Sequence, residues 1–140
     1  MINKAFCIDD DPVSLALSDI VIKKSEFARE VITAKNGKEG LNWFSVFFER
    51  NKAANEELPQ LIFLDLNMPV MNGWSFLESY LMKYAERIPE TKVVIVSATV
   101  NPEDFLKANQ YDIVIDFINK PLTAEGLANL MQNEQLIHYF

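Results

Sequence analysis

The chain alternates five times between a short apolar run rich in β-branched residues and a longer segment with helical spacing. The short runs are nearly continuous in apolar residues, which is typical of strands buried on both faces of a parallel sheet. Right-handed crossovers between such strands give a doubly wound α/β sandwich. We therefore predict a five-stranded parallel sheet with helices on both faces, its strands at Lys4–Ile8, Glu30–Ala34, Leu61–Leu64, Lys92–Ser97 and Ile113–Ile118.

Helices are expected between these strands, wherever apolar residues recur at spacings of three and four. The first begins near Pro12, with Asp11 as its N-cap. A polar loop is expected at Asn51–Pro59. The second helix is expected after the Asn36-Gly37 turn, with Leu41, Phe44, Phe47 and Phe48 on one face. The later helices are expected at Gly73–Arg87, at Pro102–Asn109 and in a segment opened by Thr123.

The length and charge of the chain exclude several classes of protein. A chain of 140 residues fits one domain, and a net charge of −7 argues against a nucleic-acid binder. The longest apolar runs, such as Val93–Val96, are too short to span a bilayer. No signal peptide precedes the first strand, and Cys7 lies in an apolar run where it reads as a core residue. We expect a cytoplasmic protein that does not bind membranes.

Polar side chains follow the last apolar residue of four predicted strands. In doubly wound folds, ligands bind at the carboxyl ends of the strands, so these side chains are expected to meet. Crowded carboxylates repel one another unless a cation intervenes, and Mg²⁺ prefers oxygen ligands. The side chains expected at this edge are Asp9, Asp10 and Asp11 after the first strand, Asp65 and Asn67 after the third, Ser97 after the fourth and Lys120 after the fifth.

These residue types suit phosphoryl chemistry. An aspartate can attack phosphorus to give an aspartyl phosphate, and Asp65 is the candidate nucleophile. Lys120 would supply a positive charge, and Ser97 a hydroxyl, to the phosphate oxygens. Each residue also has a plainer interpretation, because Asp11 can be only a helix cap and Lys120 only a surface lysine. Their joint position at one edge of the sheet favours a site.

Five motifs of the chain, in order, resemble the receiver domain of two-component response regulators, in particular the single-domain chemotaxis regulators. They are Ile8–Pro12, Ala34–Gly37, Leu64–Pro69 followed by Gly73, Val96–Ala98 and Phe117–Pro121. The resemblance covers nearly the whole chain, and the Asp-x-x-Met-Pro-x-x-x-Gly string at Asp65–Gly73 is its most specific part. It implies a flavodoxin-like (βα)5 fold and one receiver domain over residues 1–140 without an output domain.

The resemblance also implies a role for each matching residue. Asp65 would be the phosphoacceptor, and Asp9, Asp10, Asp65 and the backbone carbonyl of Asn67 would hold Mg²⁺. Ser97 and Lys120 would contact the phosphoryl group, and the switch aromatic would be Phe117. The donor would be a sensor histidine kinase or a histidine phosphotransfer protein. The downstream protein would bind the face formed by the fourth helix, fifth strand and fifth helix. The chain would be no enzyme beyond its own phosphorylation and dephosphorylation.

Two alternatives stay open. Asp9–Val13 fits the nucleophile motif of phosphatases that resemble haloacid dehalogenase, but only Glu125 and Glu134 follow Lys120 as further acids, and Asp65–Gly73 is left unexplained. A receiver-like adaptor that is never phosphorylated is the other alternative. The chain also departs from the family pattern in several places, among them Ser97, where threonine is also common, and the long loop Arg50–Pro59. No glycine occurs in Asn109–Ile113, which puts the length of the fourth helix in doubt, and the end Leu136–Phe140 is unusually apolar.

Overall fold

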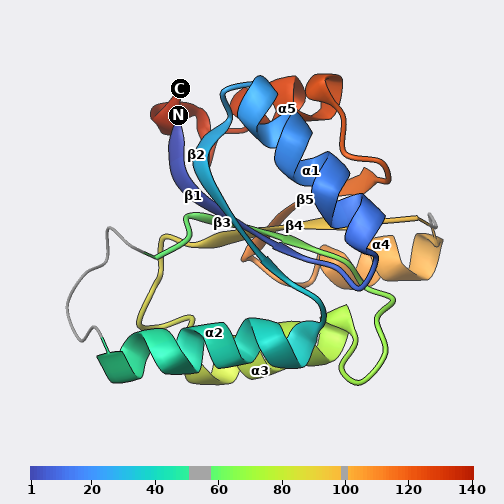
Figure 1. Cartoon of the computed structure of the whole chain (residues 1–140). Coiled ribbons are helices and arrows are strands. Elements are labelled where there is room, and N and C mark those ends of the chain that lie inside the picture. Colours follow the sequence, from blue (N-terminus) through green and yellow to red (C-terminus); the bar gives the residue numbers. More distant parts are fainter. Residues whose placement is uncertain (51–57, 99–100) are drawn as a thin grey trace.

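The computed structural model describes residues 1–50, 58–98 and 101–140, and its centre is a five-stranded parallel sheet in the order β2-β1-β3-β4-β5 (Figure 1). The order reverses beside β1, whose two neighbours are β2 and β3. This reversal is the switch point at which ligands bind in such folds. The strands are β1 (Ile2–Ile8), β2 (Ala28–Ala34), β3 (Leu61–Leu64), β4 (Lys92–Ser97) and β5 (Val114–Asn119).

Helices cover both faces of the sheet. Figure 1 shows α1 and α5 together above it and α2 and α3 together below it. The short α4 packs toward the α2–α3 side, since Ala108 belongs to the same buried cluster as residues of α2 and α3. The predicted doubly wound fold is confirmed. The helices are α1 (Pro12–Lys24), α2 (Gly37–Arg50), α3 (Gly73–Lys83), α4 (Pro102–Ala108) and α5 (Ala124–Met131), followed by a 3₁₀ turn, η2 (Ile137–Tyr139).

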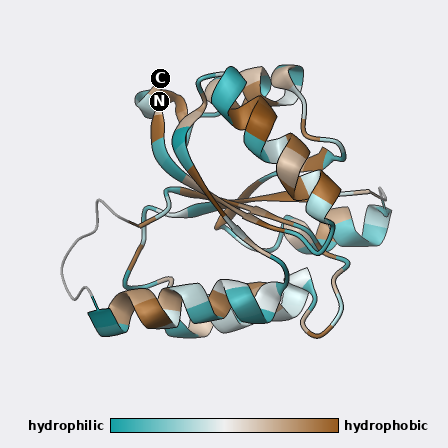
Figure 2. Cartoon of the chain, viewed as in Figure 1, coloured by the Kyte–Doolittle hydropathy of each residue, from teal (hydrophilic) through white to brown (hydrophobic). Residues whose placement is uncertain are grey.

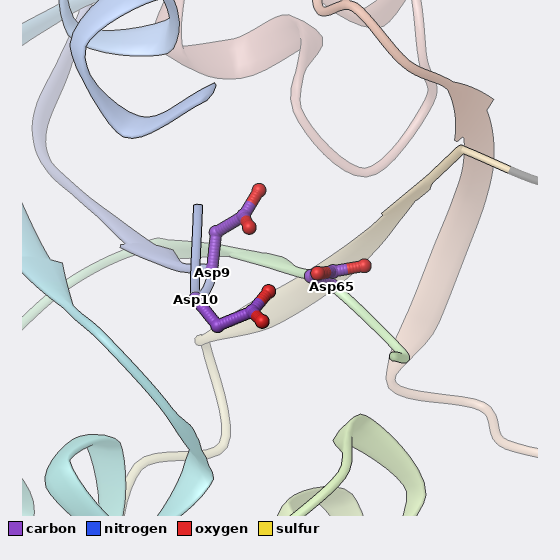
Figure 3. Close-up of side chains that lie close together, drawn as sticks. All are labelled: Asp9, Asp10 and Asp65. Carbon is purple, nitrogen blue, oxygen red and sulfur yellow. The ribbon is translucent and has the colours of Figure 1, made fainter. Parts of the chain in front are cut away.

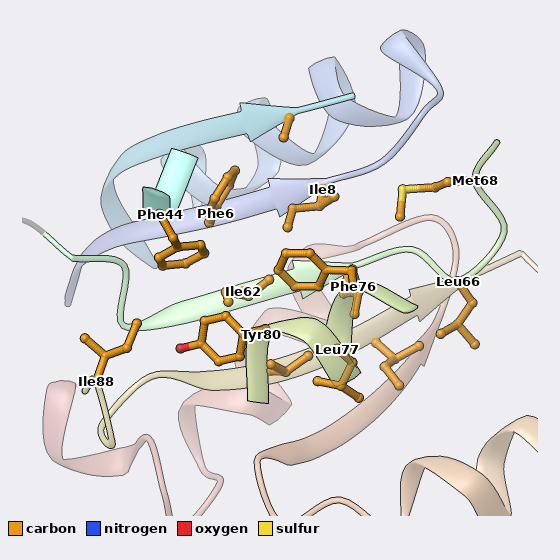
Figure 4. Packing of buried hydrophobic residues seen from close by; sticks show 14 of the residues in the cluster. Phe6, Ile8, Phe44, Ile62, Leu66, Met68, Phe76, Leu77, Tyr80 and Ile88 are labelled. Atoms are coloured by element: carbon orange, nitrogen blue, oxygen red, sulfur yellow. The ribbon is translucent and has the colours of Figure 1, made fainter. Parts of the chain in front are cut away.

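Two hydrophobic layers hold the sheet, because successive side chains of a strand point to opposite faces. Figure 2 shows the mainly apolar strands lying between the helical layers, whose residues are mixed in hydropathy. On the α2–α3 side the strand residues meet an unusually aromatic set, several of which are labelled in Figure 4. On the α1–α5 side the partners include Ile22, Leu127 and Leu130. The aromatic set comprises Phe44, Phe47, Phe76 and Tyr80, with Trp43, Phe48 and Tyr84 partly buried around it.

The main error in the predicted boundaries is the end of α3. The helix ends at Lys83, with Tyr84 at the C-cap, rather than continuing to Arg87. Pro89 disfavours helical backbone at Ile88, and the chain turns so that Ile88 enters the core, only 5% exposed. The other boundaries differ from the predicted ones by a few residues. Of the polar loop expected at Asn51–Pro59, residues 51–57 lie outside the described residues.

The apolar end of the chain packs against the sheet instead of extending into solvent. Leu136 is fully buried, and the Phe140 ring lies 5.1 Å from that of Phe27, at the end of the sheet where β1 and β2 begin. The ammonium of Met1 donates a hydrogen bond to the carbonyl of Tyr139. Within the described residues, no helix has both the length and the apolar character needed to cross a membrane.

Candidate functional site

The acidic side chains lie where β1 and β3 end, and the backbone fixes their positions. The Asp9 amide donates to the Ala34 carbonyl at 3.0 Å, and the Asp65 amide donates to the Ile8 carbonyl at 3.0 Å. These bonds continue the parallel ladders one residue beyond the strands. Both carboxylates are therefore held on the sheet itself, which restricts their movement.

Three carboxylates gather at this point. One oxygen each from Asp9, Asp10 and Asp65 lies within 4.8 Å of the others (Figure 3). Asp9 and Asp65 are 7% and 4% exposed, whereas Asp10 is open to solvent. The predicted convergence of these residues is thus present in the structure. Asp11 is different, because its carboxylate accepts from the Val13 amide at 2.9 Å and caps α1.

Lys120 supplies the positive charge at the site. Its Nζ lies 2.6 Å from Asp9 Oδ2 and 3.4 Å from Asp65 Oδ2. The Lys120 amide donates to the Ser97 carbonyl at 2.9 Å, which fixes the end of β5 against β4. Burial alone would lower the pKa of Lys120, but the hydrogen bonds and negative charges of Asp9 and Asp65 outweigh it and raise that pKa. The ammonium is therefore charged at neutral pH.

The electrostatics of Asp65 reflect a shortage of cations. Burial and the nearby charge of Asp9 raise the pKa of Asp65 from 3.8 to about 6. Lys120 and the Asn67 amide, which donates to Asp65 Oδ1 at 3.4 Å, act in the opposite direction without cancelling the increase. One ammonium is thus insufficient for these carboxylates, and a further cation at the site would favour the ionised form of Asp65.

The donor atoms fit Mg²⁺. This ion takes oxygen ligands, uses one or two protein carboxylates, and keeps water or phosphate oxygens at its remaining positions. The cluster offers three carboxylates, of which Asp10 faces solvent. The Lys120 ammonium already contacts two of these carboxylates, those of Asp9 and Asp65.

Ser97 and Phe117 lie on the neighbouring strands. Ser97 is fully buried at the end of β4, and its Oγ has no hydrogen-bond partner among the described residues. Phe117 is partly buried on β5, with its ring 6.0 Å from the ring of Phe105 on α4. The arrangement brings Ser97 close to Lys120 through the backbone bond between them and leaves its hydroxyl available to a ligand.

Gly73 has a positioning role that the sequence motif alone did not explain. A Cβ built on Gly73 would lie 2.4 Å from the Asp65 carbonyl oxygen and 2.8 Å from Leu66 Cα. The Gly73 amide donates to the Leu66 carbonyl at 2.9 Å. The loop from Asp65 therefore returns onto its own start, and only a residue without a side chain fits there. The eight-residue separation in the Asp65–Gly73 string was the signal of this contact.

Comparison with known proteins agrees with this geometry. The family model of the response regulator receiver domain matches residues 5–132. A probable C4-dicarboxylate response regulator DctR of Halalkalibacterium halodurans is 27% identical over 95% of the chain, and an uncharacterized response regulatory protein of Vibrio cholerae is 31% identical over 83%. The chain covers 52% and 47% of these two proteins, so it spans about half the length of the relatives it matches. The expectation of a single domain without an output domain stays a prediction.

Solved structures show the same fold. A two-component response regulator from Cytophaga hutchinsonii has a TM-score of 0.84 and 27% identity, with 97% of this chain and 98% of that chain covered. The chemotaxis protein CheY4 of Vibrio cholerae has a TM-score of 0.70 and 23% identity over 94% of this chain and 98% of its own, and at that identity it supports the fold alone. The protein belongs to the response regulator receiver domain family.

Proposed function

We propose that the protein is a phosphoacceptor switch in which Asp65 takes a phosphoryl group in the presence of Mg²⁺. The observation that carries the proposal is the convergence of Asp9, Asp10 and Asp65 within 4.8 Å, with the Lys120 ammonium against two of them. Asp65 lies in contact range of the Lys120 ammonium, at 3.4 Å, and near the solvent-facing Asp10. Its burial, at 4% exposure, protects an acyl phosphate from bulk water.

In the proposed step, an Asp65 carboxylate oxygen attacks the phosphorus of a phosphohistidine. A P–O bond forms as the P–N bond breaks, and the electron pair of that bond returns to the imidazole nitrogen, which takes a proton. Asp9, Asp10, Asp65 and the carbonyl of Asn67 would hold Mg²⁺, which would neutralise charge on the phosphoryl oxygens. Lys120 would pair with one phosphoryl oxygen, and the Ser97 hydroxyl would donate to another.

The donor is proposed to be another protein. The one histidine of the chain, His138, lies on η2, at the end of the molecule that carries Phe27 and Phe140 rather than the acidic cluster. A sensor histidine kinase or a histidine phosphotransfer protein would supply the phosphoryl group. The output is proposed to pass through α4, β5 and α5, because Ser97 and Lys120 join β4 to β5 and Phe117 joins β5 to α4.

The phosphatase alternative finds no support in the geometry. Its motif requires two acids of Asp9–Val13 to act together at one site, but the second of them, Asp11, is exposed and caps α1 through the Val13 amide. No corresponding difficulty applies to Asp65. The other alternative, an adaptor that is never phosphorylated, is tested by the phosphorylation experiment described next.

The test is incubation with acetyl phosphate and Mg²⁺, followed by intact mass measurement and peptide mapping. The wild-type chain should gain one phosphoryl group at Asp65, and chelation of the metal should abolish the gain. Asp65→Asn should not be labelled. Asp11→Asn is the matched control: it changes an adjacent acid to the same amide, keeps a capping oxygen, and should label normally. Labelling of Asp9, or equal labelling of Asp65→Asn, would reject the proposal, and no labelling of the wild type would favour the adaptor.

A further inference from the structure

We propose that Trp74, Tyr111 and Lys107 form a latch that ties the C-terminal end of α4 to the first turn of α3. The Trp74 ring is stacked on the Tyr111 ring, with centroids 6.0 Å apart and planes at 25°. The ammonium of Lys107 lies 4.7 Å from the Trp74 centroid. Lys107 is in the last turn of α4, and Tyr111 lies shortly after the C-cap residue Asn109.

A third contact ties Tyr111 to α3 at a second place. The Tyr111 hydroxyl donates to Glu78 Oε1 at 3.4 Å, one helical turn after Trp74. Tyr111 thus meets α3 with both its ring and its hydroxyl. Its position is set from the α4 side as well, because the Tyr111 amide donates to the Ala108 carbonyl at 3.1 Å. The glycine-free segment Asn109–Ile113, which leads from α4 to β5, therefore contributes Tyr111 to the latch.

The latch matters because α4 has few other attachments. The helix has seven residues, from Pro102 to Ala108, and large apolar side chains on it are exposed: Phe105 by 47% and Leu106 by 64%. Ala108 is buried, and Phe105 contacts Phe117 at 6.0 Å between ring centroids. A helix of this length is marginal without tertiary contacts. Its position therefore depends strongly on the Trp74–Tyr111 stack.

The latch also begins next to the acidic site. Trp74 follows Gly73, whose Cα faces the Asp65 carbonyl so closely that no Cβ fits between them. A shift of the Asp65 backbone would move the first turn of α3 and, through Trp74, the end of α4. This route is separate from the one through Ser97 and Phe117. Its bearing on signalling rests on the function proposed above, whereas the latch itself does not.

The test is hydrogen exchange of the unphosphorylated chain, with amides of residues 102–111 as the readout. Trp74→Leu and Tyr111→Leu should each speed exchange of these amides by roughly three- to tenfold, the range expected from loss of one aromatic pair. The effect of the double variant should be smaller than the sum of the two single effects, because both single variants remove the shared Trp74–Tyr111 stack. Each single variant also removes one contact of its own, that of Lys107 with Trp74 or that of Tyr111 with Glu78. Lys107→Gln should have a smaller effect.

The chain contains a matched control in the stack of Phe48 on Tyr84, with centroids 5.5 Å apart and Arg87 over the Phe48 ring at 3.8 Å. This stack also combines two aromatic rings with one cationic side chain, but none of its residues belongs to α4. Phe48→Leu should leave exchange of residues 102–111 unchanged. An equal effect of Phe48→Leu on these residues, or fully additive effects of Trp74→Leu and Tyr111→Leu, would overturn the latch.

A second readout keeps the proposal testable if Trp74→Leu fails to fold. In a Trp43→Phe background, Trp74 is the sole indole, and Tyr111→Leu should increase its quenching by acrylamide. No increase would contradict the latch. Asp65→Asn should preserve the coupling between Trp74 and Tyr111. A negative latch experiment therefore rejects the latch alone, and a negative labelling experiment rejects the proposed function alone.

Discussion

Because Gly73 contacts the Asp65 backbone, adding a single methyl group at position 73 tests whether this contact positions Asp65. Gly73→Ala would introduce a Cβ 2.4 Å from the Asp65 carbonyl oxygen, so the backbone must move. We expect a loss of about 1–3 kcal/mol in the free energy of unfolding, typical of overpacking, and a reduced rate of phosphoryl labelling. Urea unfolding and intact mass measurement would check the two effects.

Gly126 provides the control for that substitution. It is also helical, but its Cβ would meet only Thr123 Oγ1 at 3.4 Å, an ordinary contact. Gly126→Ala should therefore leave labelling unchanged and stabilise α5 by roughly 0.5–1 kcal/mol through helix propensity. Equal behaviour of the two variants would show that the contact between Gly73 and Asp65 is not what restricts this position.

Asp65 gives the molecule a predictable pH dependence in metal-free buffer. Its pKa is raised from 3.8 to about 6 by burial and by Asp9. The folded state therefore binds this proton more tightly than the unfolded chain, and the resulting stabilisation is complete below pH 3.8 and lost as the pH rises through about 6.

Asp65→Asn removes that titration. We expect its advantage in stability over the wild type to be larger at about pH 8 than at about pH 5, by the same linkage. Urea unfolding of both proteins at the two pH values measures the difference. A constant difference would mean that the pKa of Asp65 is not raised in the fold. Addition of Mg²⁺ at the higher pH should stabilise the wild type and leave the variant less affected.

At the scale of whole elements, the strands were predictable because each is a continuous apolar run buried on both sides. The predicted starts of β1 and β2, at Lys4 and Glu30, were a few residues too late. These two side chains form an ion pair at 3.7 Å across the neighbouring strands. The end of α3 was also predicted wrongly. The helical spacing continues to Tyr84, but the docking of Ile88 ends the helix.

The sequence predicted which residues gather at the site, but not the detailed contacts that their side chains make. Strand ends determined that Asp9, Asp65, Ser97 and Lys120 would meet, because parallel strands end at one edge. The preference of Lys120 for Asp9, at 2.6 Å against 3.4 Å for Asp65, depends on side-chain geometry that no sequence pattern contains. The same is true of Trp74, which follows Gly73 in sequence while its ring packs on Tyr111.

The whole molecule divides into a tightly packed region and a loosely attached one. The α2–α3 side is packed with contacting aromatic rings, including Trp43 on Phe47 with centroids 5.5 Å apart. In contrast, α4 lies beside the edge strand β5, and several of its apolar side chains are exposed. A signal that arises at Asp65 should therefore move the α4–β5 region more readily than the α2–α3 region.

Beryllofluoride, which mimics a phosphoryl group, provides the test. In the presence of Mg²⁺ it should change hydrogen exchange in α4 and β5 and leave α2 unaffected. The change should be graded, because nearly complete conversion from a state populated at one per cent needs a differential affinity worth about 5.5 kcal/mol. Asp65→Asn should show no response. Changes confined to α2 would exclude output through α4 and β5.

The buried hydroxyl of Ser97 has a consequence for the fidelity of signalling. Its Oγ has no hydrogen-bond partner among the described residues, and a buried hydroxyl that stays unpaired costs about 1–3 kcal/mol. A bare cation at the acidic cluster neutralises carboxylates but cannot accept a hydrogen bond, so it leaves that cost in place. An oxyanion attached to Asp65 can remove it. The Ser97 hydroxyl would therefore respond to a phosphoryl group on Asp65 but not to Mg²⁺ alone.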